Sequence, residues 1–357
     1  MNEWRIYQGV DRPHNGIDRL PPPPPWRDFQ DGENPGTPFD RDRHAGSGRR
    51  LPRQSAYYAD DRTIEAVNTA LYLRRPLLVT GDPGVGKSTL ADAVARELRL
   101  GTVLRWPVNS KTTLHDGLYR YDSLGRLEEA GVARARNAPE NTPQNTPEST
   151  PQNTPETVAD LGRYVSLGPL GTALAPYPLP RVLLIDEIDK SDIDLPNDLL
   201  DVFEEGSFEI PELARAADQQ ETVFVRPADD GAPVRVVRGT VRCRVFPFVI
   251  LTSNGEREFA PAFLRRCVRL ALPSVTPADE DDTRLRAIVR AHLPGAEEQA
   301  EEVIARFKQH AATGELATDQ LLNALYLVSR TSRDGAPDLD RLVQLVFQHL
   351  NVTAPAP

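Results

Sequence analysis

The chain has 357 residues, 39% of them hydrophobic, and a formal net charge of −10. This length is enough for about two domains, each able to bury its own core. The acidic balance, without a long basic run, argues against nucleic acid as the main partner, because proteins that bind duplexes usually present a basic face.

The cysteines and the hydropathy of the sequence argue against a zinc-bound, disulfide-bonded or membrane-spanning protein. Cys243 and Cys267 lie far apart without His neighbours at metal spacing, so neither a zinc site nor a disulfide framework is indicated. The N-terminus has no apolar signal core, and no run approaches the roughly 18 apolar residues that a membrane span requires. We therefore expect a cytoplasmic protein that does not contact a membrane.

Residues 1–57 are interpreted as a proline-rich, extended arm. They are rich in Pro, Gly, Asp and Arg and show neither helical nor strand periodicity. The run Pro21–Pro25 favours a stiff polyproline II segment. Two roles remain open: a spacer, or a docking peptide for a neighbouring subunit or partner, because polyproline II loses little entropy on binding.

From residue 58 to about 275 the pattern is typical of an α/β domain. Apolar residues at helical spacing predict helices over 61–73 and Ser88–Leu98. Short apolar strands alternate with such helices, which indicates a parallel sheet covered on both faces. The predicted strands are Pro76–Thr80, Thr102–Trp106, Val182–Ile185, Phe248–Thr252 and Val268–Leu272.

Two segments interrupt the α/β pattern, and a third follows it. Residues 141–156 repeat a four-residue unit with Thr-Pro pairs, which predicts a disordered insertion over about 137–157. Residues 222–245 predict a hairpin around Asp230-Gly231. Residues 276–357 predict an all-helical domain with helices at 279–292, 297–310, 319–330 and 338–350.

A phosphate-binding loop follows the first predicted strand. Gly81–Ser88 fits G-x-x-x-x-G-K-[ST], with a strand before it and a helix after it. Glycines let the loop turn tightly and aim its N–H groups at phosphate oxygens, while Lys87 neutralises the β- and γ-phosphates and Ser88 ligates Mg²⁺. The predicted nucleotide-binding residues are Gly81, Asp82, Pro83, Gly84, Val85, Gly86, Lys87, Ser88 and Thr89.

Two acids end the strand that begins after Arg181. Asp186 is predicted to hold the magnesium shell together with Ser88. Glu187 is predicted to orient and activate the attacking water, since phosphoryl transfer to water depends on placing the nucleophile in line. An Asp-Glu pair at this place favours hydrolysis over stable switching.

Two later motifs have both a structural and a catalytic interpretation. Asn254 could aim its amide at the γ-phosphate or the water, or could simply form a turn before Gly255. Arg265 and Arg266 could be ordinary salt-bridge residues. Alternatively, one of them is an arginine finger that reaches the nucleotide of an adjacent subunit.

The order of these motifs resembles the AAA+ superfamily and, within it, the MoxR-type ATPases. The residues that carry the resemblance are Leu77–Leu98, Leu183–Glu209 and Leu251–Cys267, and it extends over about 58–350. It implies a P-loop core with a five-stranded parallel sheet flanked by helices, a C-terminal helical lid, and ATP with Mg²⁺ bound between the subunits of a homo-oligomeric, hexameric ring.

The resemblance also assigns individual positions. Asn254 matches sensor 1, Arg266 matches the finger and Arg265 is a second candidate. The insertion after the second strand matches an extra helical element of this branch, and the 222–245 hairpin matches a hairpin before sensor 1. The chain departs from many relatives near 317–320, where no Arg stands at the sensor 2 position.

The function that the resemblance implies is hydrolysis of ATP to ADP and phosphate, coupled to remodelling of a protein client such as a von Willebrand factor A domain protein. Two alternatives stay open. One is an ATP-controlled signalling or defence switch, in which assembly matters more than turnover. The other is a DNA-directed AAA+ machine, against which the acidic charge weighs.

Overall fold

The computed structural model describes residues 4–10, 12–29, 36–42, 57–137, 158–273, 297–311 and 318–331, and single positions at 285–286, 289, 293 and 346. The predicted Thr-Pro repeat lies outside the described residues. None of the described helices is both long and apolar enough to cross a membrane.

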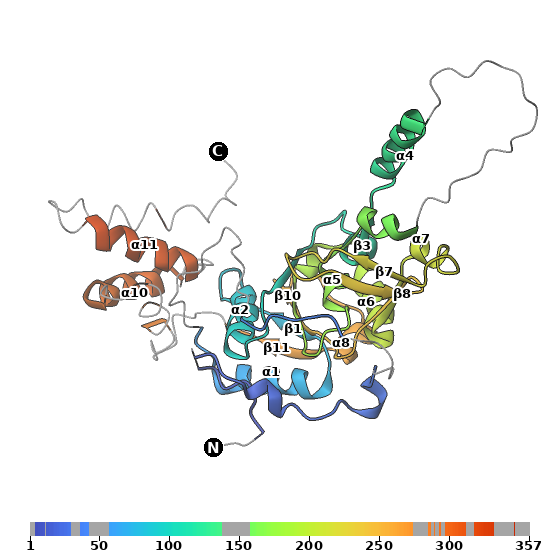
Figure 1. Ribbon diagram of the computed structural model, residues 1–357. Coiled ribbons are helices and arrows are strands. Elements are labelled where there is room, and N and C mark those ends of the chain that lie inside the picture. The colour runs from blue at the N-terminus through green and yellow to red at the C-terminus, as the bar shows by residue number, and fades with distance from the viewer. Residues whose placement is uncertain are drawn as a thin grey trace, which may run out of the picture.

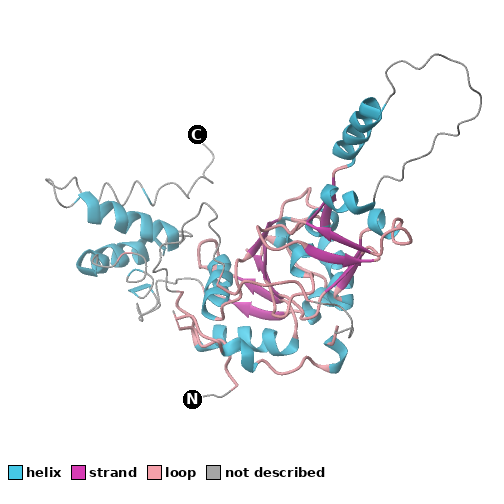
Figure 2. Cartoon of the chain, viewed as in Figure 1, coloured by secondary structure: helices cyan, strands magenta, loops and turns pink. Residues whose placement is uncertain are grey.

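The centre of the molecule is a five-stranded, fully parallel sheet with the order β11-β1-β10-β5-β2. Figures 1 and 2 show these strands surrounded by helices. This confirms the predicted α/β fold. The strands are β1 (Leu77–Thr80), β2 (Leu104–Pro107), β5 (Val182–Asp186), β10 (Phe248–Ser253) and β11 (Val268–Ala271).

Alternate residues of the inner strands β1, β5 and β10 enter two different cores, because side chains of a strand point to opposite faces. Leu77 and Val79 pack with α1 (Asp61–Leu73) and α2 (Lys87–Glu97) on one face. Leu78 packs on the other face with α5 (Pro169–Ala173), α6 (Leu195–Glu205) and α8 (Pro261–Arg266). The apolar runs of these three strands follow from this double coverage, whereas the outer strands β2 and β11 expose Arg105 and Arg269.

A second sheet lies beside the central one. It is antiparallel, with the order β6-β9-β8-β7, and β7 pairs with β8 where the sequence predicts a hairpin. The flanking strands β6 and β9 carry no such prediction, because three-residue strands give too short a pattern. The strands are β6 (Ser207–Glu209), β7 (Thr222–Val225), β8 (Val234–Val237) and β9 (Thr240–Arg242).

Short elements join the two sheets. A two-stranded ladder pairs β3 (Tyr119–Tyr121) with β4 (Val165–Leu167). Helix α4 (Ser123–Asn137) lies between β2 and β5 in the chain and stands away from the sheets in Figure 1. The remaining short helices are α3 (Leu114–Leu118), α7 (Pro211–Ala214), η3 (Val158–Tyr164) and η4 (Ile188–Lys190).

The N-terminal arm packs against the chain's own core. Ile6, Tyr7 and Ile17 are buried in the same cluster as α1 and α2. Asn68 on α1 holds the arm's backbone, accepting from the N–H groups of Ile6 and Tyr7 at 2.7 and 3.0 Å. The described residues of the arm, with two short 3-10 helices η1 (Gly16–Arg19) and η2 (Pro25–Arg27), pack against the folded domain. The spacer and docking roles of the arm stay predictions.

The C-terminal region contains α10 (Glu297–Ala311) and α11 (Thr318–Thr331), close to two of the predicted helices. These two helices share a separate apolar core that includes Ile304, Phe307, Leu321 and Leu325. The other two predicted helices, 279–292 and 338–350, lie almost entirely outside the described residues.

Candidate nucleotide-binding and hydrolysis site

Three neighbouring strands end side by side at one edge of the central sheet. Thr80 at the end of β1 is in register with Ser253 at the end of β10, and Ile185 near the end of β5 is in register with Leu251. Ligands of open α/β sheets bind beyond the carboxyl ends of the strands. The predicted motifs therefore meet at the edge where a ligand is expected.

The loop after β1 has a backbone conformation that glycine adopts easily and that would be strained for other residues. Gly81, Gly84 and Gly86 have φ angles of 152°, 77° and 94°, a region that favours glycine. A β-carbon at Gly81 would also come within 2.9 Å of the carbonyl oxygen of Leu272. Gly86 caps α2 without a side chain, so the first N–H groups of that helix can bind an anion.

Lys87 points back into this loop. Its Nζ donates to the carbonyl oxygens of Gly81 and Asp82 at 2.6 and 2.8 Å, and to Oδ1 of Asn254 at 2.7 Å. Burial lowers the pKa of Lys87, and the nearby carboxylates, led by Asp189, oppose that shift. Three protein oxygens hold the ammonium group at the place where phosphate oxygens would compete for it.

Asp186 is joined to two hydroxyl groups. Its Oδ1 accepts from Ser88 Oγ at 2.8 Å and from Thr252 Oγ1 at 2.6 Å. Thr252 also accepts the backbone N–H of Glu187 at 2.9 Å. The sequence motifs do not point to Thr252. It and Ser253 are the two polar residues that end an apolar strand, and both are fully buried.

Glu187 has an unusual backbone and a partly exposed side chain. Its φ of 61° and ψ of 49° lie in the left-handed region, which costs energy for a residue with a β-carbon. Its carboxylate forms an ion pair with Lys190 at 2.9 Å. The predicted base is thus held beside a lysine of its own chain.

Asn254 and Asp189 form the third side of the site. Asn254 precedes a bend, with Gly255 at a φ of 80°, and its Oδ1 accepts from Lys87. Its predicted role toward the γ-phosphate or the water stays a prediction. Oδ2 of Asp189 accepts the N–H groups of Asn254 and Glu256 at 2.8 and 3.2 Å. Asp189 is buried and was not singled out by the sequence, because nothing local distinguishes it from its exposed acidic neighbours.

Among the described residues, no hydrogen bond or ion pair joins Arg265 or Arg266, the two candidates for the arginine finger, to the phosphate loop. Phe263 places α8 in the core on the face opposite α2, and Arg266 ends that helix. Its Nε donates to Oε1 of Glu204 at 2.8 Å. Arg265 is exposed. The structure therefore does not join either arginine to the phosphate loop of its own subunit.

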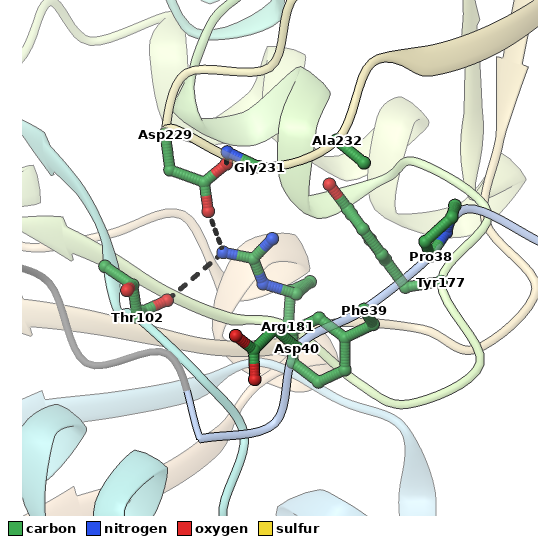
Figure 3. A pocket seen from close by; sticks show the side chains of 9 residues that line it. All are labelled: Pro38, Phe39, Asp40, Thr102, Tyr177, Arg181, Asp229, Gly231 and Ala232. Carbon is green, nitrogen blue, oxygen red and sulfur yellow. Dashed lines mark hydrogen bonds and ion pairs between the residues drawn. The ribbon is translucent and has the colours of Figure 1, made fainter.

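A separate cavity of about 280 Å³ lies near the opposite ends of the strands. Figure 3 shows Arg181, which precedes β5, between the rings of Phe39 and Tyr177 and paired with Asp229 at 2.6 Å. Phe39 belongs to the arm, so Arg181 fastens the arm to the core. None of the predicted site residues lines this cavity.

The residues at the sheet edge suit a nucleotide with Mg²⁺. Mg²⁺ prefers oxygen ligands and often takes one or two carboxylates together with substrate phosphates. Ser88 Oγ and Asp186 offer two such oxygens 2.8 Å apart, next to the loop's N–H groups. The described part of the chain has no cluster of three acidic, His or Cys side chains that could hold a metal alone, so phosphate oxygens would complete the shell.

Comparison with known proteins agrees with this geometry. A model of the AAA domain, dynein-related subfamily, matches residues 76–267, which is more than half of the chain. The match begins just before β1 and ends just after α8, so it includes the loop, both acids, Asn254 and both arginines. No curated protein matches the chain.

Proposed function

The chain belongs to the AAA family, in its dynein-related subfamily, and from this membership we propose that this P-loop ATPase works as a ring-forming, MoxR-type remodeller of a partner protein. The observation that carries the proposal is the meeting of Lys87, Ser88, Asp186 and Asn254 at one edge of the sheet. These residues provide cationic, metal-binding and polar groups around one point, as ATP hydrolysis requires.

ATP binding would begin at the loop. The N–H groups of the loop and of α2 hold the phosphates, and Lys87 exchanges its contacts with the carbonyl oxygens of Gly81 and Asp82 for phosphate oxygens. Mg²⁺, held by Ser88 and Asp186, would neutralise charge on the β- and γ-phosphates. Thr252 keeps Asp186 oriented throughout.

Hydrolysis then needs a base and an orienting group. We assign the base to Glu187, which leaves Lys190 and takes a proton from the attacking water as the oxygen bonds to the γ-phosphorus and ADP leaves. Asn254, whose N–H is fixed by Asp189, orients the γ-phosphate or the water. Within the described part of the chain, no hydrogen bond or ion pair brings Arg265 or Arg266 of this subunit to the phosphate loop to balance the charge that develops on the γ-phosphate.

A neighbouring subunit would supply that arginine. Arg266 stands at the end of α8, on the face of the sheet opposite α2, so in a ring it can face the nucleotide of the next copy, with Arg265 as the second candidate. A hexamer with one nucleotide at each interface is the assembly that we propose. The protein client, of which a von Willebrand factor A domain protein is one example, is proposed from the MoxR resemblance.

One observation favours a second candidate function. The ion pair with Lys190 occupies the carboxylate of Glu187 and has to break before that carboxylate can accept a proton. This suits a switch that assembles with ATP and turns over slowly. Sustained hydrolysis supports the remodeller, whereas slow hydrolysis with nucleotide-dependent assembly supports the signalling or defence switch.

The test combines turnover with assembly. We expect the full chain to hydrolyse ATP only with Mg²⁺, and to form rings with ATP in analytical ultracentrifugation. Glu187→Gln should still bind ATP but hydrolyse it about 100-fold more slowly, and its ATP-loaded form should retain the client in affinity capture. Unchanged turnover of Glu187→Gln would contradict the assignment of Glu187 as the base. A chain that stays monomeric under all nucleotide conditions would contradict the proposed ring.

A further inference from the structure

The N-terminal arm places a charged side chain inside the core domain. Arg27 is only 4% exposed, and a buried guanidinium is costly unless it is paired. It donates through NH1 to the carbonyl oxygen of Phe203 at 2.5 Å and lies 5.1 Å from the centre of the Phe246 ring. Burial lowers the pKa of Arg27, and the nearby Glu204 opposes that shift.

The arm is locked at this place by a second contact. Phe29 packs against Phe246, with ring centres 6.0 Å apart. It also covers Gly206, where a β-carbon would lie 2.7 Å from the Phe29 ring. Gly206, with a φ of 62°, ends α6. The arm and the C-terminal end of α6 therefore form one packed unit.

Glu204 lies in this end of α6 and faces two arginines. Its Oε1 accepts from Nε of Arg266 at 2.8 Å, and its Oε2 lies 4.0 Å from NH1 of Arg27. Arg266 has a second hydrogen bond at 3.2 Å, to the carbonyl oxygen of Ala262 in its own helix. Through this carboxylate the side chain of Arg266 is hydrogen-bonded to α6.

We infer that Arg27 and Glu204 are positioning residues for Arg266. The arm thereby belongs to the part of this subunit that completes the ATPase site of its neighbour. A free arginine side chain has many rotamers, so a finger held in one orientation loses less entropy when it meets the γ-phosphate. Arg27 lies at ion-pair distance from Glu204, which it attracts toward the arm, and Glu204 in turn accepts the hydrogen bond that orients Arg266. The arm lies outside the matched region 76–267, so family membership does not account for this contact.

The inference rests on the proposed role of Arg266, and the experiment separates the two. The variants are Arg27→Met, Glu204→Gln and Arg266→Ala in the full chain. Arg5→Met is the matched control, because Arg5 is also an arm arginine but pairs with Asp61 and Glu65 on α1. For each we measure kcat, KM for ATP and ring formation.

We expect Arg27→Met and Glu204→Gln to lower kcat roughly tenfold, with KM within about twofold, because a misplaced group impairs chemistry more than binding. Arg27→Lys should recover part of the rate. Arg5→Met should keep the normal kcat. Glu204→Gln keeps the test valid if Arg27→Met fails to fold, since Glu204 is partly exposed and the change preserves its shape.

Mixed rings distinguish positioning from a merely structural defect. Lys87→Ala subunits lack their own nucleotide site but carry an intact finger. When they are mixed with Arg27→Met subunits, some Arg27→Met sites receive a normal finger, and turnover per intact site should rise. A defect confined to the mutated subunit gives no rise, which would overturn the inference.

The remaining outcomes are also decisive. Normal kcat in both Arg27→Met and Glu204→Gln, with Arg266→Ala impaired, overturns the positioning role and leaves the finger in place. Normal kcat in Arg266→Ala removes the finger assignment and the inference with it.

Discussion

Thr252 Oγ1 lies 2.6 Å from Oδ1 of Asp186, to which it donates, and the same hydroxyl accepts the N–H of Glu187. One side chain of β10 thus fixes both acids at the end of β5. The contact arises because β10 and β5 are adjacent and parallel, so that the polar ends of both strands reach the same edge of the sheet.

Replacing Thr252 with Val removes this hydroxyl and nearly preserves the volume. Because partners of metal ligands typically contribute 10- to 100-fold in metal affinity, we expect half-maximal ATPase activity to need about tenfold more Mg²⁺. The measurement is ATPase rate against Mg²⁺ concentration. Thr252→Ser, which keeps the hydroxyl, should behave like the unmodified chain, and an unchanged Mg²⁺ requirement in the Val variant would contradict the contact's role.

Lys87→Ala should remove most nucleotide binding. A charged hydrogen-bonding group contributes about 3 kcal/mol to binding at the upper end of the usual range, which corresponds to a loss of about 100-fold in ATP affinity. Titration with a fluorescent ATP analogue measures it. Lys111→Ala is the control, because Lys111 is an exposed lysine outside the loop. Equal affinity of both variants would rule out the loop as the phosphate site.

Asp189→Ala should destabilise the fold and impair hydrolysis together. The buried carboxylate accepts two backbone N–H groups, from Asn254 and Glu256, and leaving such groups unpaired costs roughly 2 kcal/mol in the free energy of unfolding. Urea unfolding checks the stability, and kcat checks the position of Asn254. Asp201→Ala on α6, at an exposed acid, should change neither quantity. A stable, fully active Asp189→Ala variant would show that these hydrogen bonds are dispensable.

Both thiols should be unreactive in the folded protein. Burial raises the pKa of Cys243 and of Cys267 to about 12, whereas an unfolded thiol titrates near about 8.5. The folded state therefore favours the protonated thiols. Their contribution to stability is present in full below about pH 8.5 and is lost as the pH rises toward the folded values.

Iodoacetamide labelling followed by mass spectrometry tests this prediction. At pH 8 we expect slow modification of the native chain and rapid modification in urea, since only the thiolate reacts. Labelling at the same rate under both conditions would place the cysteines at the surface.

Much of the fold could be predicted because its signals are local. The five central strands are short, largely apolar runs, and their predicted positions agree with the structure to within one or two residues. The sequence pattern predicts neither the short strands β6 and β9 nor helix α4, and a helical element at the place of α4 is expected only from the family resemblance. Their patterns are too brief, or in α4 too interrupted by charged and small residues, to separate them from loop sequence.

The sequence by itself determined the phosphate loop and the two acids, because G-x-x-x-x-G-K-[ST] and a buried strand ending in Asp-Glu are each read within a few neighbouring residues. Only the tertiary structure decided which other residues join them. The position of β10 between β1 and β5 brings Thr252 to Asp186, and brings Asn254, a candidate from the sequence, to Lys87. The packing of the arm brings Arg27 to Phe203, 176 residues away in the chain. Such contacts depend on how complete elements pack, and packing leaves no periodicity in the sequence around either partner.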